Sequence, residues 1–251
     1  MICKYCGYDN EEGAVKCAAC RNKLPTSSVS SAPVKSSVEG DAFERLVQEA
    51  IKNTVEIRVI YLGNDAQLYG GAGTGFIVDG GYIVTNSHVI EGEEDLTLCA
   101  ITASFDKSVD PVDHAVEFIE AVPEADLAVF KFKGSFGKSI EKRKNFSIRT
   151  EPLRFGEEVY TIGNALGDGV AVFKGVVAHP NREIKHRGLK EAVQTSFVIN
   201  CGNSGGPLLD MKNQVVGVAT FSHEDGRNGT DYCIPAKVVN NLINVIKEEE
   251  E

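Results

Sequence analysis

Short apolar runs separated by turn residues constrain the fold of this chain more than any other feature of its sequence. The runs are GFIVDGGYIVTN, DLAVFKF, EEVYTIGN, VAVFKGVVA, AVQTSFVI, PLLD and QVVGVATF. Turn signals such as Asp79-Gly80-Gly81 and Lys212-Asn213 punctuate them. Many short strands with glycine-rich turns are typical of a β-barrel or a β-sandwich, so we expect an all-β domain.

Helices are expected at both ends of this domain. Before the first strand, one apolar face at helical spacing is formed by Phe43, Leu46, Val47, Ala50 and Ile51. Asp41 followed by Glu44 resembles a capping box and predicts where that helix starts. Near the C-terminus, a second apolar face predicts a helix that fades into four glutamates; it contains Val238, Val239, Leu242, Ile243 and Ile246.

Three segments can be distinguished along the chain. Residues 1–24 hold paired cysteines, and residues 25–40 have the serine- and proline-rich composition of a flexible linker. Residues 41–251 carry nearly all of the apolar periodicity and are expected to form the main domain.

Composition excludes some functions. The formal net charge of -10 disfavours binding to nucleic acid or to an anionic membrane. No apolar run is long enough to span a bilayer, and the sequence does not open with a secretory leader. Seven cysteines, an odd number, argue against a secreted disulfide framework. We therefore expect a cytoplasmic protein.

The segment Gly202-Asn203-Ser204-Gly205-Gly206-Pro207 is the strongest candidate for chemistry. A serine hydroxyl needs an adjacent base to act as a nucleophile, and backbone N–H groups must face the oxyanion that its attack creates. Glycines around the serine allow the backbone turn that supplies such groups. The alternative is a glycine-rich hairpin turn with a bystander serine.

Two further segments supply partners for this serine. Thr85-Asn86-Ser87-His88-Val89 places a histidine at the end of a predicted strand, and Asp126 precedes the apolar run Leu127-Ala128-Val129-Phe130. Alone, each of these residues is more often structural or a surface charge. Their order, His88, Asp126, Ser204, is that of the chymotrypsin-like proteases. The other candidates lack such flanking strands and are read as surface groups: Asp106, Asp110, Asp113, His114, His179, His186 and His223.

From about residue 54 to about residue 240, the segments GTGFIVDGGYIVTNSHVI, EADLAVFKF, VYTIGNALG and QTSFVINCGNSGGPLLD resemble the HtrA/Deg branch of the trypsin-like serine proteases. The resemblance implies two six-stranded antiparallel barrels with the site in the cleft between them. It implies a catalytic triad of His88, Asp126 and Ser204, and an oxyanion hole formed by the amides of Gly202 and Ser204. It also implies an apolar substrate pocket, formed by Val198, Val218, Ala219 and Thr220.

Two departures from the family pattern stand out. Relatives usually carry proline at the position of Cys201, so a regulatory role for this thiol beside the oxyanion glycine stays open. Relatives often continue into a PDZ domain, which is not expected here because the chain stops at Glu251. Relatives are often trimers, so a homo-oligomer is also open.

The pairs Cys3-x-x-Cys6 and Cys17-x-x-Cys20 predict one structural zinc ion per chain. The segment looks like a compact zinc ribbon, and the metal would have to supply its folding energy because it is too small for a core. The alternative is four free thiols in a disordered tail. Its basic and acidic side chains nearly balance, so a protein partner is expected rather than a nucleic acid.

Together these patterns predict a serine endopeptidase that acts on protein or peptide substrates and needs no cofactor for catalysis. A catalytically silent, peptide-binding module with the protease fold is the alternative, and it would more often show a lost triad residue. An esterase-like hydrolase would share the triad, so only substrate data distinguish it.

Overall fold

The computed structural model describes residues 38–93, 95–164, 169–184, 189–197, 199, 202–222 and 231–250, and the single residues 11, 14, 16, 18 and 19. The chain divides into two compact units, residues 1–41 and residues 42–251. The four cysteines of the predicted zinc ribbon and the predicted linker lie outside the described residues, so those predictions stay open. The second unit carries the fold and the candidate site.

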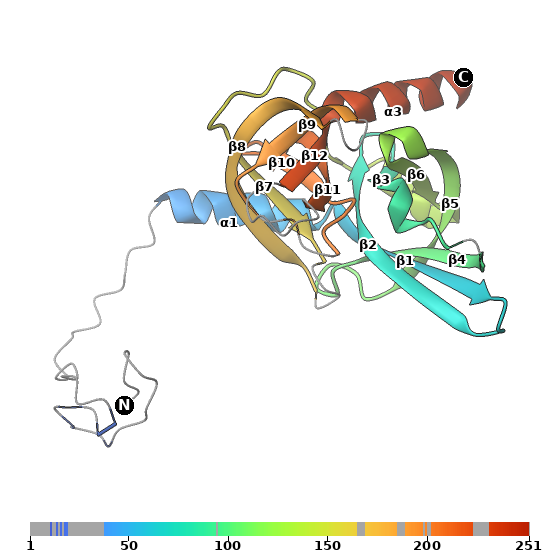
Figure 1. The fold of residues 1–251 in the computed structure, drawn as a ribbon, viewed down its shortest axis with the longest axis horizontal. Helices are drawn as coiled ribbons and strands as arrows, with labels where there is room; N and C mark the ends of the chain where they lie inside the picture. The colour runs from blue at the N-terminus through green and yellow to red at the C-terminus, as the bar shows by residue number, and fades with distance from the viewer. Residues whose placement is uncertain are drawn as a thin grey trace. The chain divides into compact units, whose positions relative to one another are not determined.

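The first half of this unit is a closed barrel with the strand order β1-β2-β3-β6-β5-β4 (Figure 1). All its pairings are antiparallel. Its strands are β1 (Thr54–Gly63), β2 (Leu68–Val78), β3 (Tyr82–Thr85), β4 (Leu96–Phe105), β5 (Asp113–Val122) and β6 (Leu127–Phe132).

The second half is another closed antiparallel barrel, with the order β10-β11-β12-β9-β8-β7. Its strands are β7 (Glu158–Gly163), β8 (Ala171–Ile184), β9 (Leu189–Thr195), β10 (Pro207–Asp210), β11 (Val215–Ser222) and β12 (Asp231–Pro235). The prediction of two six-stranded antiparallel barrels is therefore confirmed.

Alternation along β1 shows why these residues form a barrel. Val55, Ile57, Val59 and Tyr61 are buried in the interior of the first barrel, and the residues between them face outward. A strand turns successive side chains to opposite faces, so this pattern fills a barrel with every second residue. The expected turn at Asp79-Gly80-Gly81 is present, with both glycines at positive φ (95° and 77°).

A separate core lies between the two barrels and fixes how they meet. It joins Phe76, Val84 and Val129 of the first barrel to Ile162, Leu209 and Val218 of the second. Helix α3 (Ala236–Glu250) adds three side chains that are almost fully buried there: Val239, Ile243 and Ile246. Each such side chain stabilises the packing by roughly 1.5–3 kcal/mol. The relative position of the barrels, and hence of the cleft, is thus set by a shared apolar core.

The helices depart from expectation at their ends. Helix α1 (Val38–Ile51) begins before the capping-box position Asp41, and α3 stays helical as far as Glu250, within the glutamates into which the predicted helix fades. Glu250 accepts hydrogen bonds from Lys131 Nζ (2.9 Å) and Tyr82 Oη (2.7 Å) of the first barrel. A short helix, α2 (Gly134–Glu141), and the strands β4, β5 and β12 were not predicted.

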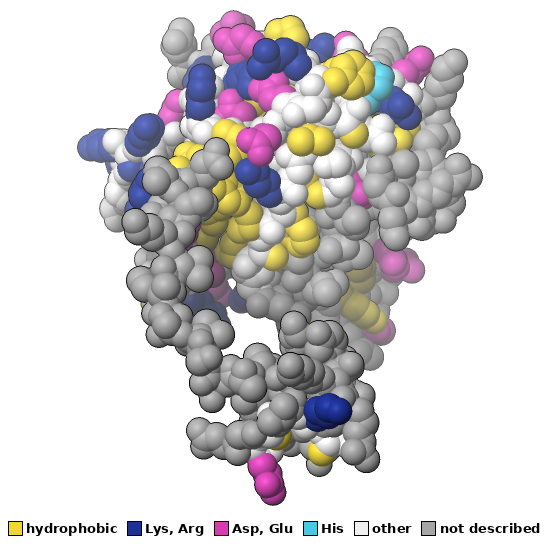
Figure 2. All heavy atoms as spheres, turned by 90° about the vertical axis from the view of Figure 1, so that its left-hand side faces the viewer, with side chains coloured by type: hydrophobic (Ala, Val, Ile, Leu, Met, Phe, Trp, Pro, Cys, Tyr) yellow, Lys and Arg dark blue, Asp and Glu magenta, His cyan; other side chains and the backbone are white. Residues whose placement is uncertain are grey.

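Among the described residues, no helix is long and apolar enough to cross a membrane. On the face shown in Figure 2, lysine and arginine side chains lie among aspartates and glutamates instead of forming a basic patch. This face therefore offers no surface of one sign for phosphate binding.

Candidate active site

His88 and Asp126 meet at one edge of the first barrel. His88 lies in the single 3-10 turn η1 (Ser87–Val89) that follows β3, and Asp126 ends the turn η2 (Pro123–Ala125) just before β6. His88 Nδ1 lies 2.9 Å from Asp126 Oδ1 and 3.0 Å from Oδ2. A carboxylate can only accept, so Nδ1 carries the proton and Nε2 is left as an acceptor in the neutral ring.

The Asp126 carboxylate is held by donors from several directions. Its oxygens also accept from the His88 amide (3.1 Å), the Ser87 hydroxyl (3.2 Å) and the Thr220 hydroxyl. Burial raises the pKa of Asp126, but the hydrogen bonds from His88 and Thr220 outweigh burial, so this pKa lies below its ordinary value. The backbone is left-handed at Asp126 (φ 51°), which aspartate tolerates better than most residues. The site thus keeps an ionised carboxylate against the imidazole.

Ser204 approaches this pair from the second barrel. Its hydroxyl donates to the Thr220 carbonyl (3.1 Å), and Thr220 also donates its own hydroxyl to Asp126. Ser204 and His88, both described, share no hydrogen bond. The structure therefore brings His88 and Asp126 into direct contact and joins Ser204 to them through Thr220.

The backbone carbonyls of residues 202–204 all accept hydrogen bonds within the protein. Three consecutive carbonyls are bonded: Gly202 O to Thr74 Oγ1 (2.6 Å), Asn203 O to the Gly206 amide (2.9 Å) and Ser204 O to the Thr74 amide (2.9 Å). Within the described part of the chain, the amides of Gly202 and Ser204 donate no hydrogen bond. Gly202 has φ 92°, a conformation that favours glycine. No acceptor among the described residues competes for the two amides that are predicted to form the oxyanion hole.

Gly205 is required by close packing as well as by its backbone. It has φ 82°, and a Cβ there would lie 2.1 Å from Thr74 O and 2.2 Å from Thr85 Oγ1. The loop of residues 202–206, which carries Ser204, therefore lies directly against the first barrel. The sequence argument for these glycines considered only the backbone turn, and it did not identify this contact.

The four residues predicted to form the substrate pocket do not share one environment in the described structure. Val218 lies fully buried in the core between the barrels, and Ala219 lies in the interior of the second barrel. Thr220 contacts Asp126 and Ser204, while Val198 lies outside the described residues. Cys201 also lies outside them.

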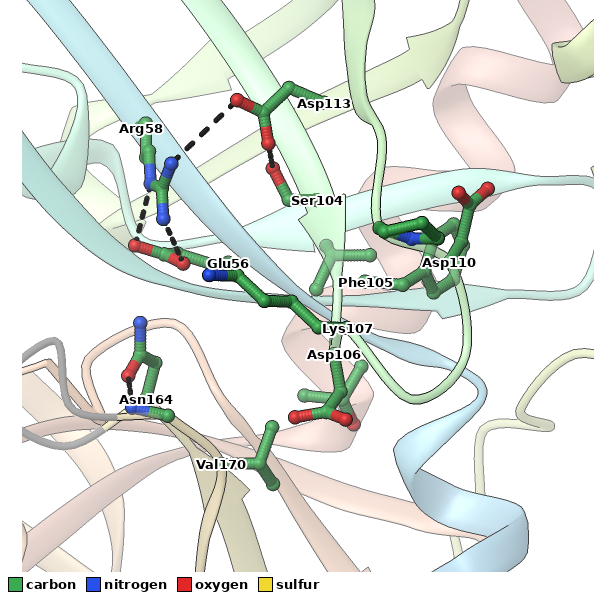
Figure 3. Close-up of a pocket in the computed structure, with 14 residues that line it drawn as sticks. Glu56, Arg58, Ser104, Phe105, Asp106, Lys107, Asp110, Asp113, Asn164 and Val170 are labelled. Carbon is green, nitrogen blue, oxygen red and sulfur yellow. Dashed lines mark hydrogen bonds and ion pairs between the residues drawn. The ribbon is translucent and has the colours of Figure 1, made fainter.

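The rival aspartates gather elsewhere, around a pocket of about 550 Å³ where the two barrels meet (Figure 3). Here Ser104 donates to Asp113, Arg58 pairs with Glu56 and Asp113, and His114 lies 2.9 Å from Asp110. This pocket contains no histidine–serine arrangement among its described residues. The contacts between His88 and Asp126 therefore make the site at the edge of the first barrel the better candidate for catalysis.

Thr220 makes a contact with Asp126 that the sequence did not predict. It was predicted to line the substrate pocket by resemblance, but its hydroxyl binds a carboxylate 94 positions away in sequence. A threonine at the end of an apolar strand gives no local signal for such a contact.

Comparisons with known proteins agree with this arrangement. The family model of the trypsin-like peptidase domain matches residues 73–218. A probable periplasmic serine endoprotease, DegP-like, of Ectopseudomonas mendocina (strain ymp) is 29% identical over 227 residues, which cover 87% of this chain and 44% of the relative. Protease Do-like 1, chloroplastic, of Arabidopsis thaliana is 32% identical over 235 residues, which cover 86% and 49%. The chain thus spans less than half of the length of these relatives.

The expected cytoplasmic location is contradicted by these relatives, because their names place them in the periplasm and in the chloroplast. That expectation depended on the start of the sequence and on an odd number of cysteines. Neither feature determines the compartment in which a folded domain works.

The family match covers more than half of the sequence, and its bounds include His88, Asp126 and Ser204. The relatives in turn carry names of the DegP and Do type, in line with the resemblance to the HtrA/Deg branch. On these grounds the chain belongs to the trypsin-like peptidase family.

Proposed function

We propose that this protein is a serine endopeptidase in which Ser204 is the nucleophile, His88 the general base and Asp126 the residue that orients the base. The observation that carries the proposal is the bond between His88 Nδ1 and an ionised Asp126, because it presents Nε2 as an acceptor at the cleft. The relatives are named serine endoproteases and a protease, which supports a protein substrate.

The reaction begins with a rotation of the Ser204 hydroxyl away from the Thr220 carbonyl and toward His88 Nε2. Attack on the substrate carbonyl transfers the hydroxyl proton to His88 and forms the bond between Oγ and carbon. The imidazolium is then stabilised by Asp126, and the oxyanion is stabilised by the free amides of Gly202 and Ser204.

Collapse of this intermediate breaks the peptide bond. His88 gives its proton to the leaving amine, which leaves an acyl group on Ser204. Water then attacks the acyl carbon while His88 accepts its proton, and a second collapse releases the acid product and restores the Ser204 hydroxyl.

The test is the change Ser204→Ala, measured as hydrolysis of unfolded casein. We expect hydrolysis to be lost while the circular dichroism spectrum and the melting temperature are retained. Ser139→Ala is a matched control, since the Ser139 hydroxyl also donates to a backbone carbonyl (Phe136 O, 2.7 Å) but lies on α2. Undiminished hydrolysis by Ser204→Ala would show that the nucleophile is wrong.

A second candidate function is a peptide-binding module without catalysis. It is favoured by the contact of the Ser204 hydroxyl with the Thr220 carbonyl, which leaves Ser204 and His88 without a shared hydrogen bond. Casein that binds the wild-type protein but is never cleaved, at any concentration or time, would support this module and exclude the endopeptidase.

We further propose that residues 1–24 bind one structural zinc ion through Cys3, Cys6, Cys17 and Cys20, and that this segment recruits a protein partner or substrate. The proposal rests on the spacing of the cysteines, which fills all four positions of a tetrahedral site. Metal analysis should give one zinc per chain, lost in the double variant with serine at Cys3 and Cys6.

A chain that starts at Asp41 tests the recruiting role. It should cleave short peptides like the full chain, since the candidate triad and oxyanion amides lie within residues 41–251, but it should lose activity on a native substrate or a pull-down partner. If this truncation destroys peptide hydrolysis, residues 1–40 belong to the catalytic assembly and the recruiting role is wrong. A homo-oligomer, implied by the resemblance, is tested by sedimentation of the full chain.

A further inference from the structure

Thr74, a residue of the first barrel, makes hydrogen bonds to residues 202–204, which contain the candidate nucleophile. It lies on β2 and is fully buried. Its amide donates to Ser204 O (2.9 Å), and its hydroxyl donates to Gly202 O (2.6 Å). The same hydroxyl accepts from the Asn164 amide (3.0 Å), and the Thr74 carbonyl accepts from Thr85 Oγ1 (2.7 Å). Thr74 thus links the first barrel to Asn164, which directly follows β7, and to the carbonyls on both sides of the peptide that carries the Ser204 amide.

The contacts of Thr74 constrain the backbone on either side of the Ser204 amide, one of the two predicted oxyanion donors. In a trans peptide the N–H and C=O groups point in opposite directions, so fixing a carbonyl fixes the amide that shares its plane. Thr74 binds the carbonyls of Gly202 and Ser204, which lie on either side of the peptide that carries the Ser204 amide. The Gly202 carbonyl shares its plane with the Asn203 amide, and the Ser204 carbonyl shares its plane with the Gly205 amide. Thr74 therefore fixes the two peptides that flank the Asn203–Ser204 peptide, and it holds the Ser204 amide in place from both sides.

The amides of Gly205 and Gly206 and the Ser204 hydroxyl also make hydrogen bonds that hold this turn, but none of these described contacts is with Gly202. The side chain of Asn203 is fully buried, yet neither its Nδ2 nor its Oδ1 has a hydrogen-bond partner there. Loss of the Thr74 hydroxyl would leave Gly202 O and the Asn164 amide without partners. Asn164 lies at the margin of the pocket in Figure 3, where its side chain accepts from the Gly169 amide (2.8 Å). A buried group without a partner is costly, so the turn is expected to move until these groups find others.

We propose that Thr74 is a positioning residue for the oxyanion hole, acting through its hydroxyl on Gly202 and through its amide on Ser204. The proposal rests on the proposed function, since the oxyanion hole has meaning only if Ser204 attacks a carbonyl. The proposal makes Thr74, a residue of the first barrel, a support for the oxyanion hole, which was expected to be formed by residues of the second barrel alone.

The hydroxyl is tested with Thr74→Val, which keeps the shape of the side chain and removes the hydrogen bonds. Removal of an oxyanion donor costs about 10²–10³ in kcat, so a misdirected donor should lower kcat by about 10- to 100-fold, with KM changed less than about twofold. Thr74→Ser is the matched control, because it keeps the hydroxyl and loses the methyl group, and its kcat should stay within about threefold of wild type. If the valine variant does not fold, Thr74→Ala gives the same comparison without added bulk.

Three results would overturn the proposal. The first is a kcat for Thr74→Val or Thr74→Ala that stays within about threefold of wild type, and the second is an effect on KM alone. The third is an equal loss of kcat in Thr74→Ser, which would indicate that packing of the methyl group matters instead of the hydroxyl. Hydrogen exchange of the amides in residues 202–206 gives a readout that does not depend on activity. Exchange should be faster in the valine or alanine variant than in the serine variant. If the wild type is inactive but this difference is found, the proposed function fails, although Thr74 still orders the backbone of residues 202–206. An equal exchange rate overturns the positioning role itself.

Discussion

Replacing Asp126 with asparagine removes one negative charge from the candidate triad and changes little else in shape. Four donor groups converge on this carboxylate: the Nδ1 and amide of His88 and the hydroxyls of Ser87 and Thr220. An amide offers one acceptor oxygen and one NH₂ group. In one of its two orientations, the NH₂ group faces His88 Nδ1 and moves the ring proton to Nε2, which then cannot accept from Ser204.

The size of the effect follows from the distance between the charges. His88 Nδ1 lies 2.9 Å from Asp126 Oδ1. Coulomb's law at that separation, with an effective dielectric constant of about 20, gives about 6 kcal/mol for an imidazolium beside the carboxylate. At 1.36 kcal/mol for each factor of ten, about 10⁴-fold of rate corresponds to about 5.5 kcal/mol, which is also the typical loss for this substitution in a serine–histidine–aspartate triad. We therefore expect kcat for casein or a peptide substrate to fall by about 10⁴-fold.

The assay compares Asp126→Asn with Asp113→Asn at a fixed pH. Asp113 also accepts a hydrogen bond from a hydroxyl, Ser104 Oγ, but it lies in the pocket of Figure 3. The control should keep kcat within about twofold of wild type, as expected for a group outside the reaction. The reasoning is refuted if Asp126→Asn keeps more than about a tenth of the wild-type kcat, or if both variants lose activity equally.

Three further predictions concern stability and specificity. Gly205→Ala should lower the free energy of unfolding in urea by about 2 kcal/mol or more beyond the loss caused by Gly156→Ala. Both glycines have positive φ, but a Cβ at Gly205 would clash with the first barrel, whereas a Cβ at Gly156 would meet no atom within 4 Å; equal losses in the two variants would contradict the close packing. The pKa of Asp126 lies below its ordinary value of 3.8, so the ionised carboxylate stabilises the fold above pH 3.8, and this contribution is lost as the pH falls through the folded-state pKa. The difference in unfolding free energy between the wild type and Asp126→Asn should therefore shrink on acidification. A difference that stays constant would refute this. Cleavage should follow small or medium apolar residues, because resemblance places Val198 and no carboxylate at the pocket floor; a peptide-library preference for lysine or arginine would show otherwise.

Most of the barrel strands could be predicted because their apolar residues alternate or form short runs between turns. The strands that were missed lack this signal. β5 contains a register shift between Phe118 and Glu120, which breaks the alternation. Most of the first half of β4 is exposed and only its last three residues are buried, so its sequence shows no full alternation; β12 is only five residues long. Local pattern cannot identify such strands, because closure of the barrel is what holds them in place.

The candidate triad was identified from flanking sequence, but its supporting contacts were not. Thr220 and Thr74 bind groups that are 94 and 128 positions away, in Asp126 and Gly202. A hydrogen bond across the cleft depends on how two barrels pack, and no periodicity in the sequence records that packing. The contact of the Ser204 hydroxyl with Thr220 O likewise depends on packing that the sequence pattern does not record.

The most direct test of the central claim is reaction of the folded wild-type protein with a fluorophosphonate, followed by mass spectrometry of its peptides. Such a probe forms a covalent bond only with a serine that an adjacent base activates. The account predicts one adduct per chain, on Ser204, with labelling much slower in Asp126→Asn and no adduct on this peptide in Ser204→Ala. A folded wild-type protein that remains unlabelled, or an adduct on another residue, would contradict it.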